Sequence, residues 1–160
     1  MSIIKHIIDT PLGWMMVEGS VEFIQKTYWI EEDDIVVGQG TSQAKWKTAL
    51  EEQCNRYFEG RQKEFNLPLK AEGTAFQESV WKRLREIPSG TTITYSQLGG
   101  IEKSRAIGSA VGANPILLFI PCHRVIGSDG MLHGYAAGLE RKEALLKIEG
   151  AIQNQQLRLF

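Results

Sequence analysis

The chain changes character near its middle, and this change limits its possible folds more than any other feature. Residues 1–40 contain runs rich in β-branched and aromatic residues, such as Trp14 to Val17 and Val21 to Ile30. From Thr74 onward the apolar residues show helical spacing instead, interrupted by glycine and proline. The 160 residues suffice for one domain or two small ones. We therefore expect two halves, connected by Arg61 to Gly73.

The first half is predicted to contain strands followed by one helix. A turn at Thr10 to Gly13 separates two short strands, and another β-prone segment spans Ile35 to Val37. A helix is predicted from Thr41 or Ser42 to Phe58, because apolar residues recur there every three to four positions with charges between them. Gly60 stands where a C-terminal cap belongs.

The second half begins with Thr74-Ala75-Phe76-Gln77, which has the spacing of a capping box, so a helix is predicted from there to Ile87. Short helices followed by a hairpin are typical of a helix-turn-helix with a wing, a shape that nucleic-acid binders use. The later predicted segments are β-prone Thr91 to Thr94, a helical turn at Tyr95 to Leu98, a helix from Ser104 to Val111, a buried strand or extended segment from Ile116 to Ile120, a hairpin of Val125-Ile126 and Met131-Leu132, and a helix from Leu139 to Glu149.

Composition argues against several classes of protein. The net charge of -1 argues against a general polyanion-binding protein, although a local basic patch can still bind nucleic acid. No apolar run approaches the length needed to span a bilayer, and the N-terminus lacks the pattern of a signal peptide. The two cysteines, Cys54 and Cys122, form no disulfide framework. We therefore expect a cytoplasmic protein with no membrane partner.

Cys122 is the candidate nucleophile, set in the run Ile120-Pro121-Cys122-His123-Arg124-Val125-Ile126. A free cysteine is often simply buried, which is the alternative for Cys122 and the preferred interpretation of Cys54. Pro121 fixes the backbone before Cys122, while His123 and Arg124 place a proton acceptor and a cation beside it. Both kinds of neighbour are expected to lower the pKa of the thiol.

A nucleophile and its base usually need a third group that orients the base. Candidate carboxylates are Glu140, Glu143 and Glu149 on the last predicted helix; Glu149 stands out because an acid is not electrostatically favoured at a helix C-terminus. A thiol hydrolase would show the same residues, so this pattern alone leaves the reaction open. The cysteines and histidines have no ligand-pair spacing, and we expect no metal.

The run around Cys122 resembles the active-site signature of the O6-alkylguanine-DNA alkyltransferases, also called methylated-DNA–protein-cysteine methyltransferases. The resemblance covers nearly the whole chain and is densest from Gly73 to Gly150. Its further motifs are Thr10-Pro11-Leu12-Gly13, Tyr57-Phe58-Glu59-Gly60-Arg61, Thr74-Ala75-Phe76-Gln77, Val80-Trp81, Ile87-Pro88-Ser89-Gly90-Thr91, Tyr95, Arg105-Ala106-Ile107-Gly108, Asn114-Pro115, Gly134-Tyr135, Leu145-Leu146 and Glu149-Gly150.

The resemblance implies an α/β (α+β) fold. A ribonuclease-H-like domain would span residues 1–70, and a winged helix-turn-helix alkyltransferase domain carrying the reactive cysteine would span residues 71–160. The implied activity is DNA repair by irreversible, single-turnover transfer of an alkyl group, such as methyl, from O6-alkylguanine to Cys122, with O4-alkylthymine as a second candidate substrate. The implied partner is double-stranded DNA containing alkylated bases; we expect a monomer without cofactor or metal.

The resemblance also implies residue roles. Cys122 would accept the alkyl group, His123 would act through a bound water as the base, and Glu149 would orient His123. Tyr95 would donate to guanine N3 and so assist its departure, and Arg105 would fill the gap left by the flipped nucleotide. The other implied DNA-binding residues are Ser104, Ala106 and Gly108, and the implied substrate-binding residues are Asn114, Val125, Tyr135 and Ala136.

Some positions depart from the family pattern. The segment from Tyr95 to Arg105 is about one helical turn shorter, which bears on DNA docking. Ala136 offers only its backbone amide to O6, and Ala137 replaces a common glycine, which narrows the pocket for bulky adducts. The alternative function is a non-catalytic, alkyltransferase-like protein that binds damaged DNA. Such proteins replace the reactive cysteine, so Cys122 argues against this alternative.

Overall fold

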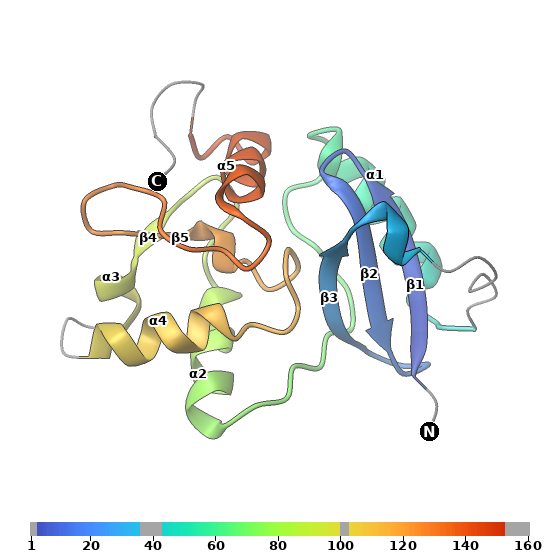
Figure 1. Ribbon diagram of the computed structural model, residues 1–160, viewed down its shortest axis with the longest axis horizontal. Helices are drawn as coiled ribbons and strands as arrows, with labels where there is room; N and C mark the ends of the chain where they lie inside the picture. Colours follow the sequence, from blue (N-terminus) through green and yellow to red (C-terminus); the bar gives the residue numbers. More distant parts are fainter. Residues whose placement is uncertain (1–2, 36–42, 100–102, 153–160) are drawn as a thin grey trace. The chain divides into compact units, whose positions relative to one another are not determined.

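The computed structural model describes residues 3–35, 43–99 and 103–152 (Figure 1). The chain divides into two compact units: Met1–Glu72 with Pro115–Leu117, and Gly73–Asn114 with Leu118–Phe160. Each unit has its own helices, and the first has a larger sheet. The α/β class predicted from the sequence is confirmed, while the assignment of named folds to the two domains stays a prediction.

A three-stranded antiparallel sheet forms the base of the first unit, in the order β1-β2-β3. The strands are β1 (Ile4–Thr10), β2 (Gly13–Gly19) and β3 (Ile24–Ile30), and they confirm the strands predicted before residue 31. Thr10 fixes the first turn, because its hydroxyl donates to the Gly13 carbonyl at 2.7 Å.

The β-prone segment predicted at Ile35 to Val37 is not a strand where it is described. Ile35 directly follows a short 3-10 helix, η1 (Glu32–Asp34), and its N–H bonds back to the Glu32 carbonyl. Residues 36 and 37 lie outside the described residues.

Helix α1 (Lys47–Phe58) packs beside β1 and buries Leu50, Cys54 and Tyr57 (Figure 1). The prediction that this helix extends back to about Ser42 is wrong over the described residues 43–46. Those residues are held by the β2–β3 turn instead. The Trp46 indole donates to the Ser20 carbonyl at 2.9 Å, and the Lys45 N–H bonds the Val21 carbonyl. This tertiary anchor overrides local helical spacing.

The second unit is built around three helices, α2 (Ala75–Leu84), α3 (Tyr95–Gly99) and α4 (Ser104–Gly112), which pack on one another. The predicted capping box is confirmed: the Thr74 hydroxyl accepts from the Gln77 N–H, and the Thr74 N–H donates to the Gln77 side chain.

Helix α2 ends at Leu84, earlier than the predicted Ile87. Arg85 still has helical backbone angles as the C-cap, but the chain then tightens, because the Ile87 N–H bonds the Leu84 carbonyl three residues back. Tight turns of this kind are common at helix ends. Ile87 remains buried, so the apolar spacing that predicted a longer helix reports core packing here.

Gly99 allows α3 and α4 to approach closely. A Cβ atom added to Gly99 would lie 2.3 Å from the Ile107 Cδ1 atom, well inside van der Waals contact. Gly99 belongs to α3, so this helix is one residue longer than the helical turn predicted at Tyr95 to Leu98. The shortened stretch between Tyr95 and Arg105 includes residues 100–102, which lie outside the described residues.

The segment from Ile116 to Ile120 is buried, as predicted, but beyond Ile116 it forms a turn and a bend, not the predicted strand or extended segment. Ile116 forms an isolated parallel bridge with Thr27 of β3, within the first unit. Leu118 then adopts a φ of 74°, which ends the extended conformation. The apolar, β-prone run predicted a strand or an extended segment, whereas the positive φ of Leu118 turns the chain.

The hairpin predicted after Cys122 closes its turn, and Leu132 is a bridge residue, but β5 also has a partner that the prediction did not include. β5 (Val125–Ile126) pairs in parallel with β4 (Ile93–Thr94), the strand predicted at Thr91 to Thr94. The turn itself forms, because the Gly127 N–H donates to the Met131 carbonyl at 2.9 Å. The sequence indicated the turn but could not indicate the distant strand that pairs with β5.

Helix α5 (Leu139–Ile148) closes the described part of the second unit and confirms the last predicted helix. Glu149 is its C-cap and is followed by Gly150 with a φ of 76°, a conformation that favours glycine. Leu146 of α5 packs with Leu132 and Ile152 in a small core. Among the described residues, no helix combines the length and apolarity that crossing a membrane requires.

Candidate active site

Cys122 opens a short 3-10 helix, η3 (Cys122–Arg124), and is only 4% exposed. Two hydrogen bonds fix the backbone leading to it. The Cys122 N–H donates to the Ile120 carbonyl at 2.8 Å, and the Asn114 side-chain amide donates to the same carbonyl at 2.9 Å. Asn114 therefore braces the turn that presents the thiol.

His123 and Glu149 form a buried pair. The His123 Nε2 atom lies 2.8 Å from the Glu149 Oε2 atom, and both side chains are at most 1% exposed. Of the three candidate carboxylates of the last predicted helix, Glu149, the C-cap of α5, is the one that contacts His123. Glu140 is exposed, and Glu143 pairs with Lys147 at 3.4 Å.

Arg124 points to Glu149. Its guanidinium donates through Nε to Oε1 and through Nη2 to Oε2, each at 2.9 Å, and through Nη1 to the Ile87 carbonyl at 2.6 Å. Burial alone raises the pKa of Glu149, but the hydrogen bonds and charges of His123 and Arg124 lower it to about 2. Glu149 is therefore ionised at neutral pH.

The ionised carboxylate determines which nitrogen of His123 carries the proton. A carboxylate only accepts, so the Nε2 atom must donate, and in a neutral imidazole Nδ1 is then the acceptor. Burial lowers the pKa of His123, and Glu149 only partly offsets this, so the neutral form predominates at neutral pH. The buried Nδ1 atom has no hydrogen-bond partner among the described residues. It is available as a proton acceptor.

The prediction that His123 and Arg124 lower the pKa of the Cys122 thiol is wrong. Burial raises that pKa to about 11, and the opposing influences come from the Asn114 side chain, the Lys142 charge and the backbone. Sequence adjacency placed Arg124 next to the thiol, but its guanidinium is engaged by Glu149 and Ile87. The resting cysteine is therefore a neutral thiol that needs a base.

Two tyrosines stand near the thiol. The Tyr95 hydroxyl donates to the His133 carbonyl at 3.1 Å, and burial together with the Cys122 charge raises the pKa of Tyr95. The Tyr135 ring meets the His123 ring edge to face, with centroids 6.4 Å apart, and its buried hydroxyl has no partner among the described residues. Both tyrosines can donate hydrogen bonds to a molecule bound beside Cys122.

Comparisons with known proteins agree with this geometry. The family model described as "6-O-methylguanine DNA methyltransferase, DNA binding domain" matches residues 75–151. The methylated-DNA–protein-cysteine methyltransferase of Methanosarcina acetivorans is 41% identical over 155 residues, covering 91% of this chain and 97% of that protein. The chain belongs to the methylated-DNA–protein-cysteine methyltransferase family.

Solved structures support the same assignment. A crystal structure of the Mycobacterium tuberculosis O6-methylguanine methyltransferase has a TM-score of 0.78 at 33% identity, covering 97% of both chains. A crystal structure of Mycobacterium tuberculosis OGT in complex with DNA also has a TM-score of 0.78, at 37% identity and 92% coverage of both chains.

The DNA-contacting residues expected of this methyltransferase lie on α4. Ser104, Arg105 and Ala106 are exposed in its first turn, whereas Ile107 is fully buried. Gly108 is half-buried, with open space where a Cβ would stand. One side of α4 thus packs in the core while small residues and one arginine face outward.

The expected substrate-binding residues are divided between core and surface. Val125 is fully buried in β5, and Ala136 is exposed in the loop before α5. Sequence reasoning missed one buried group of this methyltransferase, Lys142 on α5, which is 0% exposed. Its helical spacing from Leu139, Leu145 and Leu146 was the available signal, because it places a lysine on the apolar stripe.

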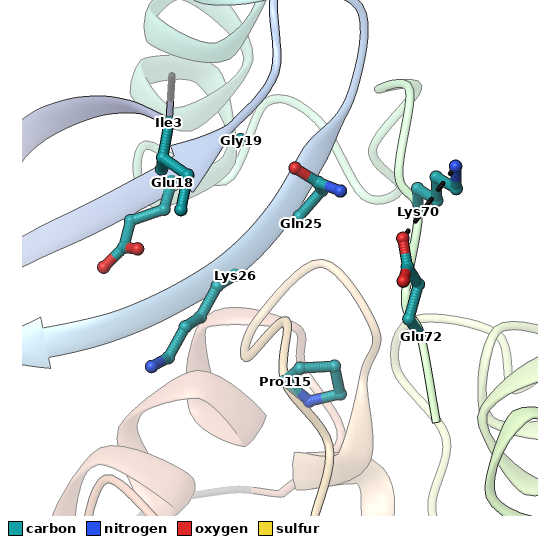
Figure 2. Close-up of a pocket in the computed structure, with 8 residues that line it drawn as sticks. All are labelled: Ile3, Glu18, Gly19, Gln25, Lys26, Lys70, Glu72 and Pro115. Atoms are coloured by element: carbon teal, nitrogen blue, oxygen red, sulfur yellow. Dashed lines mark ion pairs between the residues drawn. The ribbon is translucent and has the colours of Figure 1, made fainter. Parts of the chain in front are cut away.

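A pocket in the first unit differs from this site in chemistry (Figure 2). It is lined by Ile3, Glu18, Gly19, Gln25, Lys26, Lys70, Glu72 and Pro115, without a cysteine or histidine. Lys70 and Glu72 pair across part of its rim at 3.8 Å. Over the described ranges, no group of three or more His, Cys, Asp or Glu side chains is placed to hold a metal ion.

Proposed function

We propose that this methyltransferase removes an alkyl group from the O6 atom of guanine in duplex DNA and keeps it on Cys122. The observation that carries the proposal is the buried arrangement of Cys122, His123 and Glu149, with a free acceptor nitrogen on His123. The name of the M. acetivorans relative, and the DNA complex of the M. tuberculosis relative, support the substrate class.

Proton transfer comes first in this mechanism. The thiol has a pKa of about 11, so it requires the base, and the Nδ1 atom of His123 accepts its proton through an intervening water. Glu149 stabilises the imidazolium that forms, because its carboxylate is already ionised and hydrogen-bonded to Nε2. Arg124 positions that carboxylate.

Alkyl transfer follows as one displacement. The Cys122 sulfur forms a bond to the alkyl carbon, the carbon–O6 bond breaks, and its electron pair leaves with the guanine. Tyr95 donates a hydrogen bond to guanine N3, and the Ala136 amide contacts O6. In the free protein the Tyr95 hydroxyl is engaged by the His133 carbonyl, so guanine binding exchanges one acceptor for another. The bonds made and broken balance without a cofactor.

The remaining proposed roles concern DNA. The second unit acts as a winged helix-turn-helix, with α4 lying against the duplex, and the first unit as a ribonuclease-H-like domain. A thiol cannot reach O6 inside stacked DNA, so the base is flipped out and Arg105 occupies the gap. Asn114, Val125 and Tyr135 shape the pocket for the flipped base. We place this activity in the cytoplasm and assign it to a monomer.

The test is a titration of O6-methylguanine duplex against a known amount of active protein. Repair is expected to stop at one lesion per molecule, with one methyl group added to the peptide that contains Cys122. The thioether formed is stable because sulfur is a reluctant leaving group, and Cys54 is a buried thiol whose pKa is raised to about 12 by burial. Repair far beyond one lesion per molecule, or a methyl group on another peptide, would refute the proposal.

Arg105→Ala is expected to separate base flipping from chemistry. Repair of duplex DNA should slow by at least about tenfold, because extruding a base costs a few kcal/mol that Arg105 helps to offset. Reaction with free O6-benzylguanine base should change little, because no stack has to be opened. Single-turnover rates on both substrates measure the difference.

Two variants serve as controls for that comparison. Tyr95→Phe should slow both substrates, since help to the leaving group applies to each. Arg61→Ala removes an exposed arginine of the first unit, which pairs with Glu59, and should change neither rate. Equal slowing of duplex and free base by Arg105→Ala would assign Arg105 to a different role.

A further inference from the structure

Lys142 is a lysine buried without a carboxylate partner among the described residues. Its ammonium donates to the His133 carbonyl at 3.0 Å and to the Gly134 carbonyl at 3.1 Å, and the residue is 0% exposed. Lysine is almost never fully buried unless its charge is compensated, and an apolar side chain would fill this position at lower cost. The location therefore requires an explanation beyond packing.

The His133 and Gly134 carbonyls belong to the loop that carries Tyr135 and Ala136, two residues expected to bind the substrate. Gly134 has a φ of 58°, and the loop returns to α5 at Gly138. The next residue toward the N-terminus of α5, Arg141, donates to the Ala137 carbonyl at 3.1 Å. Consecutive side chains of α5 thus hold both ends of the loop that carries Tyr135 and Ala136.

The His133 carbonyl accepts from two donors, the Tyr95 hydroxyl and the Lys142 ammonium. In the proposed reaction Tyr95 turns to guanine N3 and releases this carbonyl. The Lys142 ammonium then remains as its donor, so the loop keeps its conformation while Tyr95 exchanges partners.

Lys142 is also the cation whose charge acts on Cys122. Its charge favours the thiolate, and the thiolate in turn favours the charged lysine. Burial lowers the pKa of Lys142 to about 8, so this charge is lost just above neutral pH. The guanidinium of Arg124 does not stabilise the Cys122 thiolate in this way, because it donates two hydrogen bonds to Glu149.

We propose that Lys142 is a positioning residue of the transfer reaction: its buried ammonium holds the His133–Gly134 loop and stabilises the Cys122 thiolate as it forms. The inference rests on the proposed function for its biological meaning. The expected effect of Lys142 on the reactivity of the Cys122 thiol can be measured without DNA.

The test is the rate at which iodoacetamide alkylates Cys122 in the full chain between pH 6.5 and 9.5, with the Cys122 and Cys54 peptides separated by mass spectrometry. For a thiol with a raised pKa, the logarithm of the rate rises in proportion to pH. In the wild type this line should bend downward near pH 8, because the thiolate loses its cation when Lys142 deprotonates.

Four other ionisable groups of this site have pKa values shifted away from pH 8. The pKa of His123 is lowered from 6.5, that of Glu149 is lowered to about 2, and those of Tyr95 and Tyr135 are raised above 10.0. His133 offers Lys142 its backbone carbonyl, while its exposed ring pairs with Asp129. The bend therefore reports Lys142.

Three variants separate the possible roles. Lys142→Arg keeps a cation and should give a straight line without the bend. Lys142→Met should also give a straight line, but with rates about tenfold lower at pH 7, since a neighbouring opposite charge shifts a pKa by at least about one unit. Lys147→Met removes a lysine from the same helix that pairs with Glu143 and should behave as the wild type.

The outcomes are distinct. A folded Lys142→Met protein with wild-type thiol reactivity and wild-type repair of O6-methylguanine duplex would overturn the inference. If Lys142→Met does not fold, a bend that persists in Lys142→Arg overturns it. Failure of the wild-type protein to repair DNA would instead refute the proposed function, while the iodoacetamide rates would still report on Lys142.

Discussion

Cys122→Ser is expected to reduce alkyl transfer to background while binding of O6-methylguanine duplex stays close to that of the wild type. A hydroxyl is far less readily ionised than a thiol, and burial already raises the pKa of the thiol to about 11. The serine is almost the same size and has polar surroundings, because Asn114 interacts with the Cys122 side chain. Intact-mass analysis measures transfer, and electrophoretic mobility shift measures binding.

Cys54→Ser is the matched control for that experiment. Cys54 is also buried, at 2% exposure on α1, but it belongs to the first unit, and burial raises the pKa of its thiol to about 12. Transfer should be retained, after allowance for any loss of folded protein. Transfer by Cys122→Ser at a rate near that of the wild type would remove Cys122 from its proposed role.

The elements that the sequence predicted well have a local cause. The capping box of Thr74 and Gln77 specifies the start of α2 through hydrogen bonds three residues apart. Gly150 ends α5 because its left-handed φ favours glycine. Such signals need no knowledge of the rest of the chain, which is why these helices were predicted near their true bounds.

The elements that it predicted poorly depend on distant partners. Trp46 stands before α1 because its indole reaches Ser20, and β5 pairs with β4 across more than thirty positions of sequence. Leu118 is buried, as predicted, but its positive φ turns a β-prone run away from the extended conformation. Pattern alone assigns burial at these positions, but tertiary contacts decide the backbone.

The same distinction applies to the candidate site. The residue pattern singled out Cys122, His123 and Glu149 as candidates, the family resemblance implied their roles, and the structure brings the last two together at 2.8 Å. Adjacency to Cys122 predicted an electrostatic role for Arg124, but the side chain turns to Glu149. The cation that acts on the thiol lies twenty positions later, at Lys142, where sequence distance gave no indication of contact.

Arg124→Met is expected to cause the largest loss of stability of any change at this site. It removes the two guanidinium hydrogen bonds to the Glu149 carboxylate, which is 1% exposed, and leaves the carboxylate bonded to the neutral His123. Breaking a buried ion pair by removing one member costs about 3–5 kcal/mol of unfolding free energy. For a chain of this size that corresponds to a melting temperature lower by on the order of 10 °C.

The double variant Arg124→Met, Glu149→Gln is the matched control, because it removes the uncompensated charge while keeping an acceptor for His123. It should be more stable than Arg124→Met alone at pH 7. The difference between its loss of unfolding free energy and the sum of the losses in the two single variants measures the interaction between Arg124 and Glu149. Equal stability of wild type and Arg124→Met would show that the ion pair contributes nothing.

The pH dependence of the unfolding free energy should report the same ion pair between Arg124 and Glu149. The pKa of Glu149 falls from 4.5 to about 2 on folding, so the stabilisation it gives is fully present above pH 4.5 and is lost as pH falls toward 2. That difference corresponds to about 3 kcal/mol. The lowered pKa of His123 acts in the same direction, since stability falls as pH drops below 6.5. In Arg124→Met, the lowering effect of the guanidinium is lost while burial still raises the pKa of Glu149, so this pKa should rise and acid unfolding should begin at higher pH. Denaturant titrations of both proteins from pH 7 to pH 3 measure this shift, and coincident pH profiles would contradict it.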